Sequence, residues 1–147
     1  MANTETKVNE VAKVATESVS RSMPLYTSRP QAGFPAPADD QVEKILDIND
    51  LVVKNPASTF FVRVEGDSME GAGIFSGDVL VVDRAVDAKD GRIVVAAVNG
   101  ELVVKRLSKL SGQPVLLSEN EQYAPIYLGD DEECFIWGVV VGSVRQF

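Results

Sequence analysis

The sequence contains no histidine and only one cysteine, Cys134. Without histidine, neither a Ser-His-Asp triad nor a Cys-His pair can form, and most zinc sites lose their usual ligands. A single cysteine cannot form an internal disulfide, which fits a reducing, cytoplasmic location. Because Cys134 precedes an apolar segment, we expect a packing thiol rather than a reactive one. The sequence therefore predicts neither a metal site nor a cofactor.

A long apolar run and an excess of positive charge are missing too. No stretch of about 18 apolar residues occurs, so we expect no membrane span. The first residues also lack the layout of an export signal. The chain has 14 basic and 22 acidic residues, a formal net charge of −8. Strong direct binding to nucleic acid requires a basic surface and is not expected.

Residues 1–40 differ in composition from the rest of the 147-residue chain. A short, weak helix is compatible with the three- and four-residue spacing of Val8, Val11, Ala15 and Val19. Further on, the chain is held extended by Pro24, Pro30, Pro35 and Pro37. An extended peptide centred on Ala32-Gly33 also has the conformation that a protease cleft binds. We expect residues 1–40 to form a flexible arm and residues 41–147 to form one β-rich domain.

Short apolar segments separated by turn residues predict a mainly β structure, antiparallel or mixed, after residue 41. We expect strands at residues 59–65, 78–83, 92–98, 101–107, 115–118 and 135–144. The dipeptide Asn99-Gly100 predicts a type I′ hairpin between two of them. Asp47 and Pro56 bracket a segment that favours one short helical turn, with Asp47 as its cap.

A turn rich in glycine follows the first of these strands and presents Ser68 and Met69. The glycines around them, Gly66, Gly71 and Gly73, can take backbone angles that other residues avoid, and they let another chain approach closely. Successive N–H groups in such a turn, those of Ser68 and Met69, can stabilise a developing oxyanion. The same residues are also compatible with an ordinary turn that has no chemistry.

Lysine is the base available to activate Ser68 once histidine is absent. In the strand expected at residues 101–107, alternation places Lys105 on the same face as Val103 and Leu107. Aliphatic neighbours remove an amine from water, and this favours the neutral form that a base requires. A neutral Lys105 could take the proton of Ser68 as its oxygen attacks a carbonyl.

Several separated segments together resemble the LexA/UmuD peptidase family, and its UmuD-like members in particular. They are Gly66-Asp-Ser-Met69, Gly77-Asp-Val-Leu-Val-Val-Asp83, Gly91-Arg-Ile-Val-Val-Ala-Ala-Val98, Glu101-Leu-Val-Val-Lys105 and the arm Ala32-Gly-Phe-Pro-Ala-Pro-Ala38. The resemblance covers residues 31–141. It implies the β-fold shared by LexA and signal peptidase, with paired, partly open sheets and a dimer-forming surface.

The resemblance also implies roles for individual residues. Ser68 matches the family's nucleophile and Lys105 its general base. The Ala32-Gly33 bond in the arm matches the site of self-cleavage, so residues 41–147 would be the Ser-Lys peptidase and dimerisation domain. Residues 1–22 match no part of the family's pattern, which leaves their role open.

The function implied by the resemblance lies in the SOS response to DNA damage. A RecA filament on single-stranded DNA would stimulate self-cleavage of this serine endopeptidase. The shortened homodimer would then serve as the accessory subunit of an error-prone, UmuC-like Y-family DNA polymerase. DNA contact would come through these partners.

Two other readings share much of this pattern. In a non-catalytic β interaction domain that binds a polymerase, Ser68 and Lys105 would be inert. A LexA-type self-cleaving transcriptional repressor would need a DNA-binding domain, which the proline-interrupted residues 1–40 do not supply.

Overall fold

A computed structural model describes residues 4–15, 21–26, 42–120, 122–129 and 133–147. The chain divides into two compact units, one made of Met1–Val14 with Asn55–Phe147 and the other of Ala15–Lys54. Each unit is described by itself below. The predicted cleavage residues Ala32 and Gly33 lie outside the described residues.

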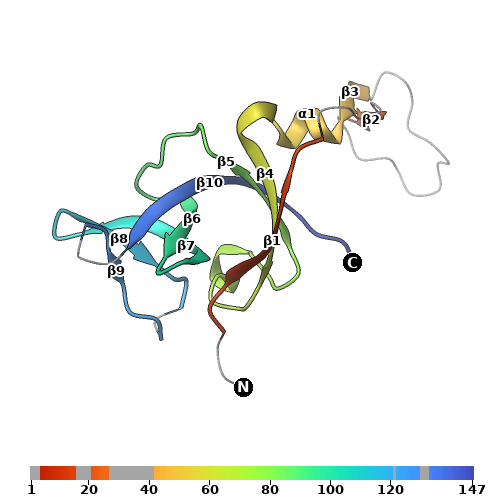
Figure 1. The fold of residues 1–147 in the computed structure, drawn as a ribbon. Coiled ribbons are helices and arrows are strands. Elements are labelled where there is room, and N and C mark those ends of the chain that lie inside the picture. Colours follow the sequence, from red (N-terminus) through yellow and green to blue (C-terminus); the bar gives the residue numbers. More distant parts are fainter. Residues whose placement is uncertain (1–3, 16–20, 27–41, 121, 130–132) are drawn as a thin grey trace. The chain divides into compact units, whose positions relative to one another are not determined.

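Eight strands of the described chain form one antiparallel sheet in the first unit, in the order β1-β4-β5-β10-β6-β7-β8-β9 (Figure 1). In chain order they are β1 Lys7–Lys13, β4 Thr59–Glu65, β5 Val79–Asp83, β6 Ile93–Val98, β7 Glu101–Leu110, β8 Gln113–Leu117, β9 Ile126–Tyr127 and β10 Cys134–Val144. The predicted strand at residues 59–65 is β4 to the residue, and the other predicted strands agree within three residues at each end. The mainly β fold is confirmed.

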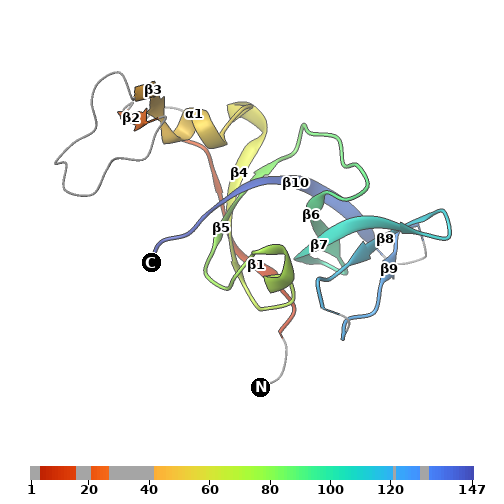
Figure 2. The same ribbon diagram turned by 180° about the vertical axis from the view of Figure 1, so that it is seen from behind.

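The strand β1 spans the opening of this curved sheet, as the views from both sides show (Figures 1 and 2). It pairs with β4 along its length and also meets β7, where Lys7 lies opposite Val103. The Val104 N–H donates to the carbonyl oxygen of Thr6 at 3.0 Å. Without β1, β4 would have an unpaired edge, and so would the first half of β7, which β8 does not cover.

Residues 7–13 are therefore a strand and not the weak helix with which the spacing of the valines is compatible. Valine is branched at Cβ and favours strands over helices. The edge of β4 supplies a partner for the backbone N–H and C=O groups of β1. Pairing with β4, which is distant in sequence, therefore selects the strand over the helix.

The buried side chains form two clusters. The first contains Val62, Val64, Met69, Ile74, Leu80, Val82, Val95 and Val104. The second contains Val94, Ala96, Val103, Leu107, Leu116 and Val139, and the half-buried Cys134 packs against it. Since side chains alternate along a strand, β6 and β7 contribute to both clusters. Val103 and Leu107, which share a face with Lys105, belong to the second.

The predicted turns are confirmed in detail. Asn99 and Gly100 have φ values of 50° and 83°, the positive angles of a type I′ turn, and they join β6 to β7. In the second unit, α1 (Ile48–Val52) starts at Asp47, whose side chain accepts a hydrogen bond from the Asn49 N–H at 2.8 Å. Within the described residues, no helix is long and apolar enough to cross a membrane.

The remaining elements are short. In the second unit, β2 (Ser22–Tyr26) pairs antiparallel with β3 (Val42–Asp47). In the first unit, the 3-10 turn η2 (Pro56–Ser58) leads into β4, and η3 (Glu70–Ala72) follows Ser68 and Met69.

Candidate active site

Ser68 lies in the tight turn that follows β4. Gly66 begins the turn with a φ of 110°, and Gly73 ends η3 with a φ of 83°. Both angles fall in the region that favours glycine. Ser68 itself is fully buried, and the next side chain, Met69, is buried in the first core cluster. Packing of Met69 thus fixes the backbone that presents the serine.

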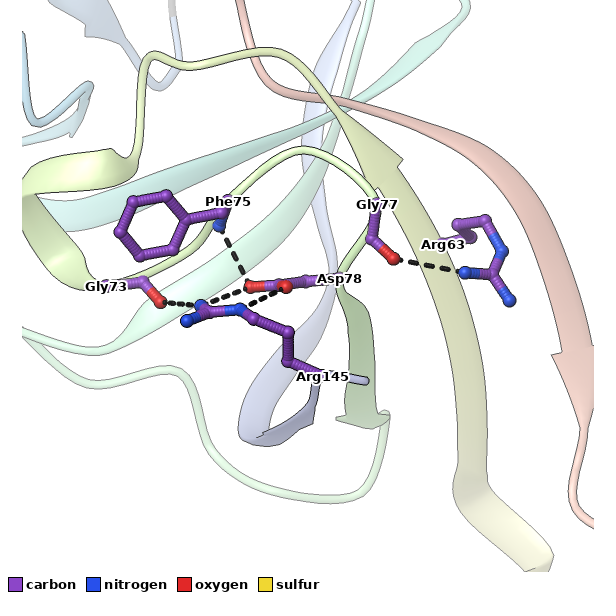
Figure 3. Close-up of polar contacts among 6 residues, drawn as sticks. All are labelled: Arg63, Gly73, Phe75, Gly77, Asp78 and Arg145. Carbon is purple, nitrogen blue, oxygen red and sulfur yellow. Dashed lines mark hydrogen bonds and ion pairs between the residues drawn. The ribbon is translucent and has the colours of Figure 1, made fainter. Parts of the chain in front are cut away.

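The loop after Ser68 is held by an ion pair at the start of β5 (Figure 3). Arg145 donates to both carboxylate oxygens of Asp78, at 2.7 and 2.8 Å, and to the carbonyl oxygen of Gly73 at 2.9 Å. The Phe75 N–H donates to Asp78 at 2.9 Å, and the Phe75 ring stacks on the guanidinium. The hydrogen bonds from Arg145 lower the pKa of Asp78, which is only 1% exposed.

Lys105 lies in β7 opposite Val94 of β6 and is 1% exposed, so the predicted burial among aliphatic residues is observed. Its ammonium nitrogen Nζ donates to Ser118 Oγ at 2.7 Å and forms an ion pair with Glu5 Oε1 at 2.6 Å. The same nitrogen lies 5.3 Å from the centre of the Tyr123 ring. Burial raises the pKa of the Tyr123 hydroxyl, and the charges of Asp67 and Glu5 add to the effect.

Ser68 and Lys105 meet neighbouring residues of one peptide. The Thr6 N–H donates to Ser68 Oγ at 2.8 Å, while the preceding residue, Glu5, pairs with Lys105. Among the described residues, no hydrogen bond joins Ser68 Oγ directly to Lys105 Nζ. Residues 5 and 6 thus contact both functional groups.

A carbonyl oxygen accepts the backbone N–H groups of the serine turn. Thr4 O accepts from the Asp67 N–H at 2.8 Å and from the Ser68 N–H at 3.1 Å. The Thr4 N–H in turn donates to Asp67 Oδ1 at 2.7 Å. One of the two predicted oxyanion donors, Ser68, therefore binds a carbonyl here, and Asp67 rather than Met69 is the second donor to it.

Comparison with known proteins identifies the family of the chain. The model of the family described as Peptidase S24-like matches residues 24–141. The chain belongs to the peptidase S24-like family. SamA of Salmonella typhimurium strain LT2 is 45% identical over 130 residues, which cover 88% of this chain and 90% of SamA. MucA of Escherichia coli is 44% identical over 126 residues, 85% of this chain and 86% of MucA.

The LexA repressor of Bordetella petrii is 37% identical over 142 residues, 96% of this chain and 62% of that repressor. The resemblance to UmuD-like members of the LexA/UmuD family is thereby confirmed. Membership of the S24-like family supports a self-cleaving serine peptidase in general terms. The residues that carry out the reaction, and the bond that is cut, remain predictions.

Sequence reasoning missed Ser118, although a signal for it exists. Ser111-Gly112 is a two-residue turn that pairs Leu110 with Gln113. Continuing that register places Ser118 opposite Lys105. By contrast, Glu5 and Thr6 give no such signal, because their partners lie far away in the sequence and residues 4–13 precede the segment matched by the S24-like family.

Proposed function

We propose that the protein is a self-cleaving Ser-Lys peptidase that cuts its own Ala32-Gly33 bond. The observation that carries the proposal is the shared peptide contact: Ser68 and Lys105 are both fully buried, yet both bind consecutive residues of one extended segment. A buried lysine beside a peptide-binding serine is the arrangement that serine peptidase chemistry requires when histidine is absent.

The reaction would proceed in two steps. In the first, Ser68 Oγ attacks the Ala32 carbonyl carbon while a neutral Lys105 accepts the serine proton. The Ala32–Gly33 C–N bond then breaks, the lysine returns the proton to the Gly33 nitrogen, and an ester joins Ala32 to Ser68. In the second, water hydrolyses this ester with Lys105 again as base, which releases the Ala32 carboxylate and restores Ser68.

Backbone N–H groups would stabilise the negative oxygen formed in each step. The Ser68 N–H is one donor. The sequence predicts Met69 as the second, whereas the contact with Thr4 O supports Asp67. Removal of one such donor in other serine peptidases slows the reaction by about 100- to 1,000-fold, so the turn that presents them would contribute substantially to the rate.

We place this activity in the cytoplasm and in the SOS response. A RecA filament on single-stranded DNA would favour the conformer that has the arm in the cleft. The homodimer of residues 33–147 would then bind an error-prone, UmuC-like Y-family polymerase. This assignment rests on the family membership and on a net charge that is unsuited to direct DNA binding.

Ser118 would act as a positioning residue for Lys105. Its hydroxyl accepts a hydrogen bond from the lysine at 2.7 Å, so Ser118→Ala removes a contact that sets the direction of the amine. We expect about tenfold slower cleavage from the loss of one hydrogen bond to a charged group. Ser118→Thr keeps the hydroxyl and should restore most of the rate, whereas a role in stability alone would change the melting temperature instead.

The central experiment is mass spectrometry of the full chain after incubation at about pH 10, where a larger fraction of lysine is neutral. A fragment that begins at Gly33 is expected, and Ser68→Ala and Lys105→Ala should each abolish it. Lys109→Ala is the matched control, since this exposed lysine lies on the same strand. The pH should not be raised further, because the pKa of Tyr123 is raised in the folded protein and its ionisation opposes folding.

Absence of the fragment at pH 10 and with an activated RecA filament would overturn the catalytic proposal. A folded but uncut chain that still binds the polymerase would then support the non-catalytic interaction domain. Specific binding to an operator sequence would support a repressor.

A further inference from the structure

Residues 4–6 bind the proposed nucleophile, the proposed base and one of the predicted oxyanion donors. Ser68 Oγ accepts the Thr6 N–H, Lys105 Nζ pairs with Glu5, and the N–H groups of Asp67 and Ser68 bind Thr4 O. The bond predicted to be cut cannot use these groups at the same time. The chain's own N-terminal segment is therefore bound where a substrate would bind.

The manner of binding is also that of a peptide ligand. Residues 4–13 run antiparallel to β4, and the Thr6 carbonyl accepts a hydrogen bond from Val104 of β7 on the other side. Addition of an extended strand to exposed sheet edges is a common way to bind peptides, since backbone hydrogen bonds provide most of the affinity. The opening between β4 and β7 thus receives a strand.

Gly66 allows this close approach. A Cβ atom at this position would come closer to the Glu5 carbonyl oxygen than real Cβ atoms come, and would lie 2.8 Å from Thr6 Cα. Any larger residue would push the N-terminal segment away from Ser68. The chain thus has a glycine at the position where the bound segment crosses the serine turn.

The bound segment is held in a form that does not react. Ser68 Oγ accepts the Thr6 N–H at 2.8 Å, so the bound segment presents a backbone N–H to the serine oxygen where a substrate would present a carbonyl carbon. Lys105 Nζ is engaged by the Glu5 carboxylate and by Ser118 Oγ, and among the described residues it makes no hydrogen bond to Ser68 Oγ. Adjacent residues of one segment thus occupy both the proposed nucleophile and the proposed base.

We propose that residues 4–13 are a pseudosubstrate strand, a built-in competitor that occupies the peptidase cleft and keeps the protein latent until it leaves. The proposal rests on the proposed function, and it assigns a role to the segment that precedes the S24-like match. Residues 7–31, which separate Thr6 from Ala32, are long enough when extended for one chain to exchange the two segments.

Several features make this strand easy to release. Thr6 Oγ1 is buried and has no hydrogen-bond partner within the described residues, which weakens the bound state. Beyond Val8, the side chains of β1 are exposed, so little apolar surface holds the strand. These features suit a competitor that the arm has to displace.

The test is the rate of self-cleavage of the full chain near neutral pH with an activated RecA filament. Glu5→Gln removes the ion pair with Lys105, and Thr6→Pro removes the N–H that occupies Ser68 Oγ. Each should accelerate cleavage about tenfold, the effect of one hydrogen bond to a charged or reactive group. Glu10→Gln is the matched control: it makes the same charge change in β1, where Glu10 pairs with the exposed Arg63.

Thr6→Val should slow cleavage rather than accelerate it. It keeps the shape of the side chain and the backbone N–H, and it removes the unpaired hydroxyl. The bound strand should become more stable, and cleavage should be several-fold slower. If the strand is a competitor, Glu5→Gln and Thr6→Pro should accelerate cleavage and Thr6→Val should slow it. If the strand only stabilises the fold, every variant should cleave more slowly or at an unchanged rate.

A fluorophosphonate probe that reacts with an accessible nucleophilic serine separates this inference from the proposed function. Faster labelling of Ser68 in Glu5→Gln and Thr6→Pro, but not in Glu10→Gln, would support the pseudosubstrate strand. Ser68-dependent cleavage and labelling at equal rates in all N-terminal variants would overturn the inference and leave the peptidase intact. Absence of cleavage and labelling in every variant would overturn the proposed function itself.

Discussion

The strands β1 and β5 flank the same strand, β4, and both pair with it antiparallel. β5 has the sequence Val-Leu-Val-Val-Asp, and all its side chains after Val79 are buried. β1 has the sequence Lys-Val-Asn-Glu-Val-Ala-Lys, and its side chains from Asn9 onward are exposed. Two strands with equivalent backbone pairing thus differ almost completely in what their side chains bury.

This difference separates a strand of the core from a strand that binds to it. The hydrogen-bond ladder is formed by backbone groups and is available to either sequence. Removal of β5 would expose apolar side chains that belong to the first core cluster, Leu80 and Val82. Release of β1 would expose much less apolar surface, and this is what an exchangeable strand requires.

The largest expected effect is the difference in the free energy of unfolding between a truncation in β5 and a truncation in β1. Leu80→Ala in β5 removes a fully buried side chain and should lower the free energy of unfolding by about 2–5 kcal/mol. Val11→Ala in β1 shortens a side chain that is 45% exposed, and the free energy of unfolding should change by less than about 0.5 kcal/mol. Urea unfolding of both variants measures the contrast, and similar losses would mean that β1 belongs to the core.

A smaller effect concerns Asp78, which precedes β5. Asp78→Asn weakens the contact with Arg145 and should lower stability at neutral pH by about 1–3 kcal/mol. Because Arg145 lowers the pKa of Asp78 in the folded protein, this stabilisation is present above the ordinary carboxyl pKa. It is lost as the pH falls through the lowered value.

Urea unfolding between pH 7 and pH 2.5 measures this dependence. The native chain should lose more stability on acidification than Asp78→Asn does, so the two curves should converge at low pH. Asp83 is a second buried carboxylate with a lowered pKa, but its partners are uncharged. Its burial acts to raise the pKa, but hydrogen bonds from Ser58, Asn55 and the Ala85 N–H outweigh it and lower the pKa of Asp83. If the stability curves of the native chain and Asp78→Asn stay parallel, the contact with Arg145 is not the cause of the loss of stability in acid.

The parts of the site that sequence could predict are those fixed by local patterns. Ser68 stands out because glycines with positive φ surround it, and Lys105 because alternation along β7 places it between buried aliphatic residues. Ser118 was predictable in principle, since the turn after Leu110 sets the register of β8 against β7. Each of these features depends on neighbours within a hairpin or a turn.

The role of residues 4–13 could not be predicted for the opposite reason. Thr6 is separated from Ser68 by 62 positions, and β1 has a spacing of valines that fits a weak helix as well as a strand. The deciding interaction is an open sheet edge that exists only after the rest of the sheet has folded. No local pattern in residues 4–13 contains that information.

The smallest expected effect concerns the ion pair between Lys7 and Glu101, which joins β1 to β7 at 2.8 Å. The hydrogen bond to Glu101 raises the pKa of Lys7, but the two side chains are 42% and 60% exposed, and water and salt screen such pairs. Glu101→Gln should therefore change the rate of self-cleavage by less than about twofold. The matched measurement is the rate of Glu5→Gln, since the native Glu5 carboxylate pairs with the buried Lys105. Equal acceleration by the two variants would mean that charge on the surface holds β1, and that contact with Ser68 and Lys105 does not.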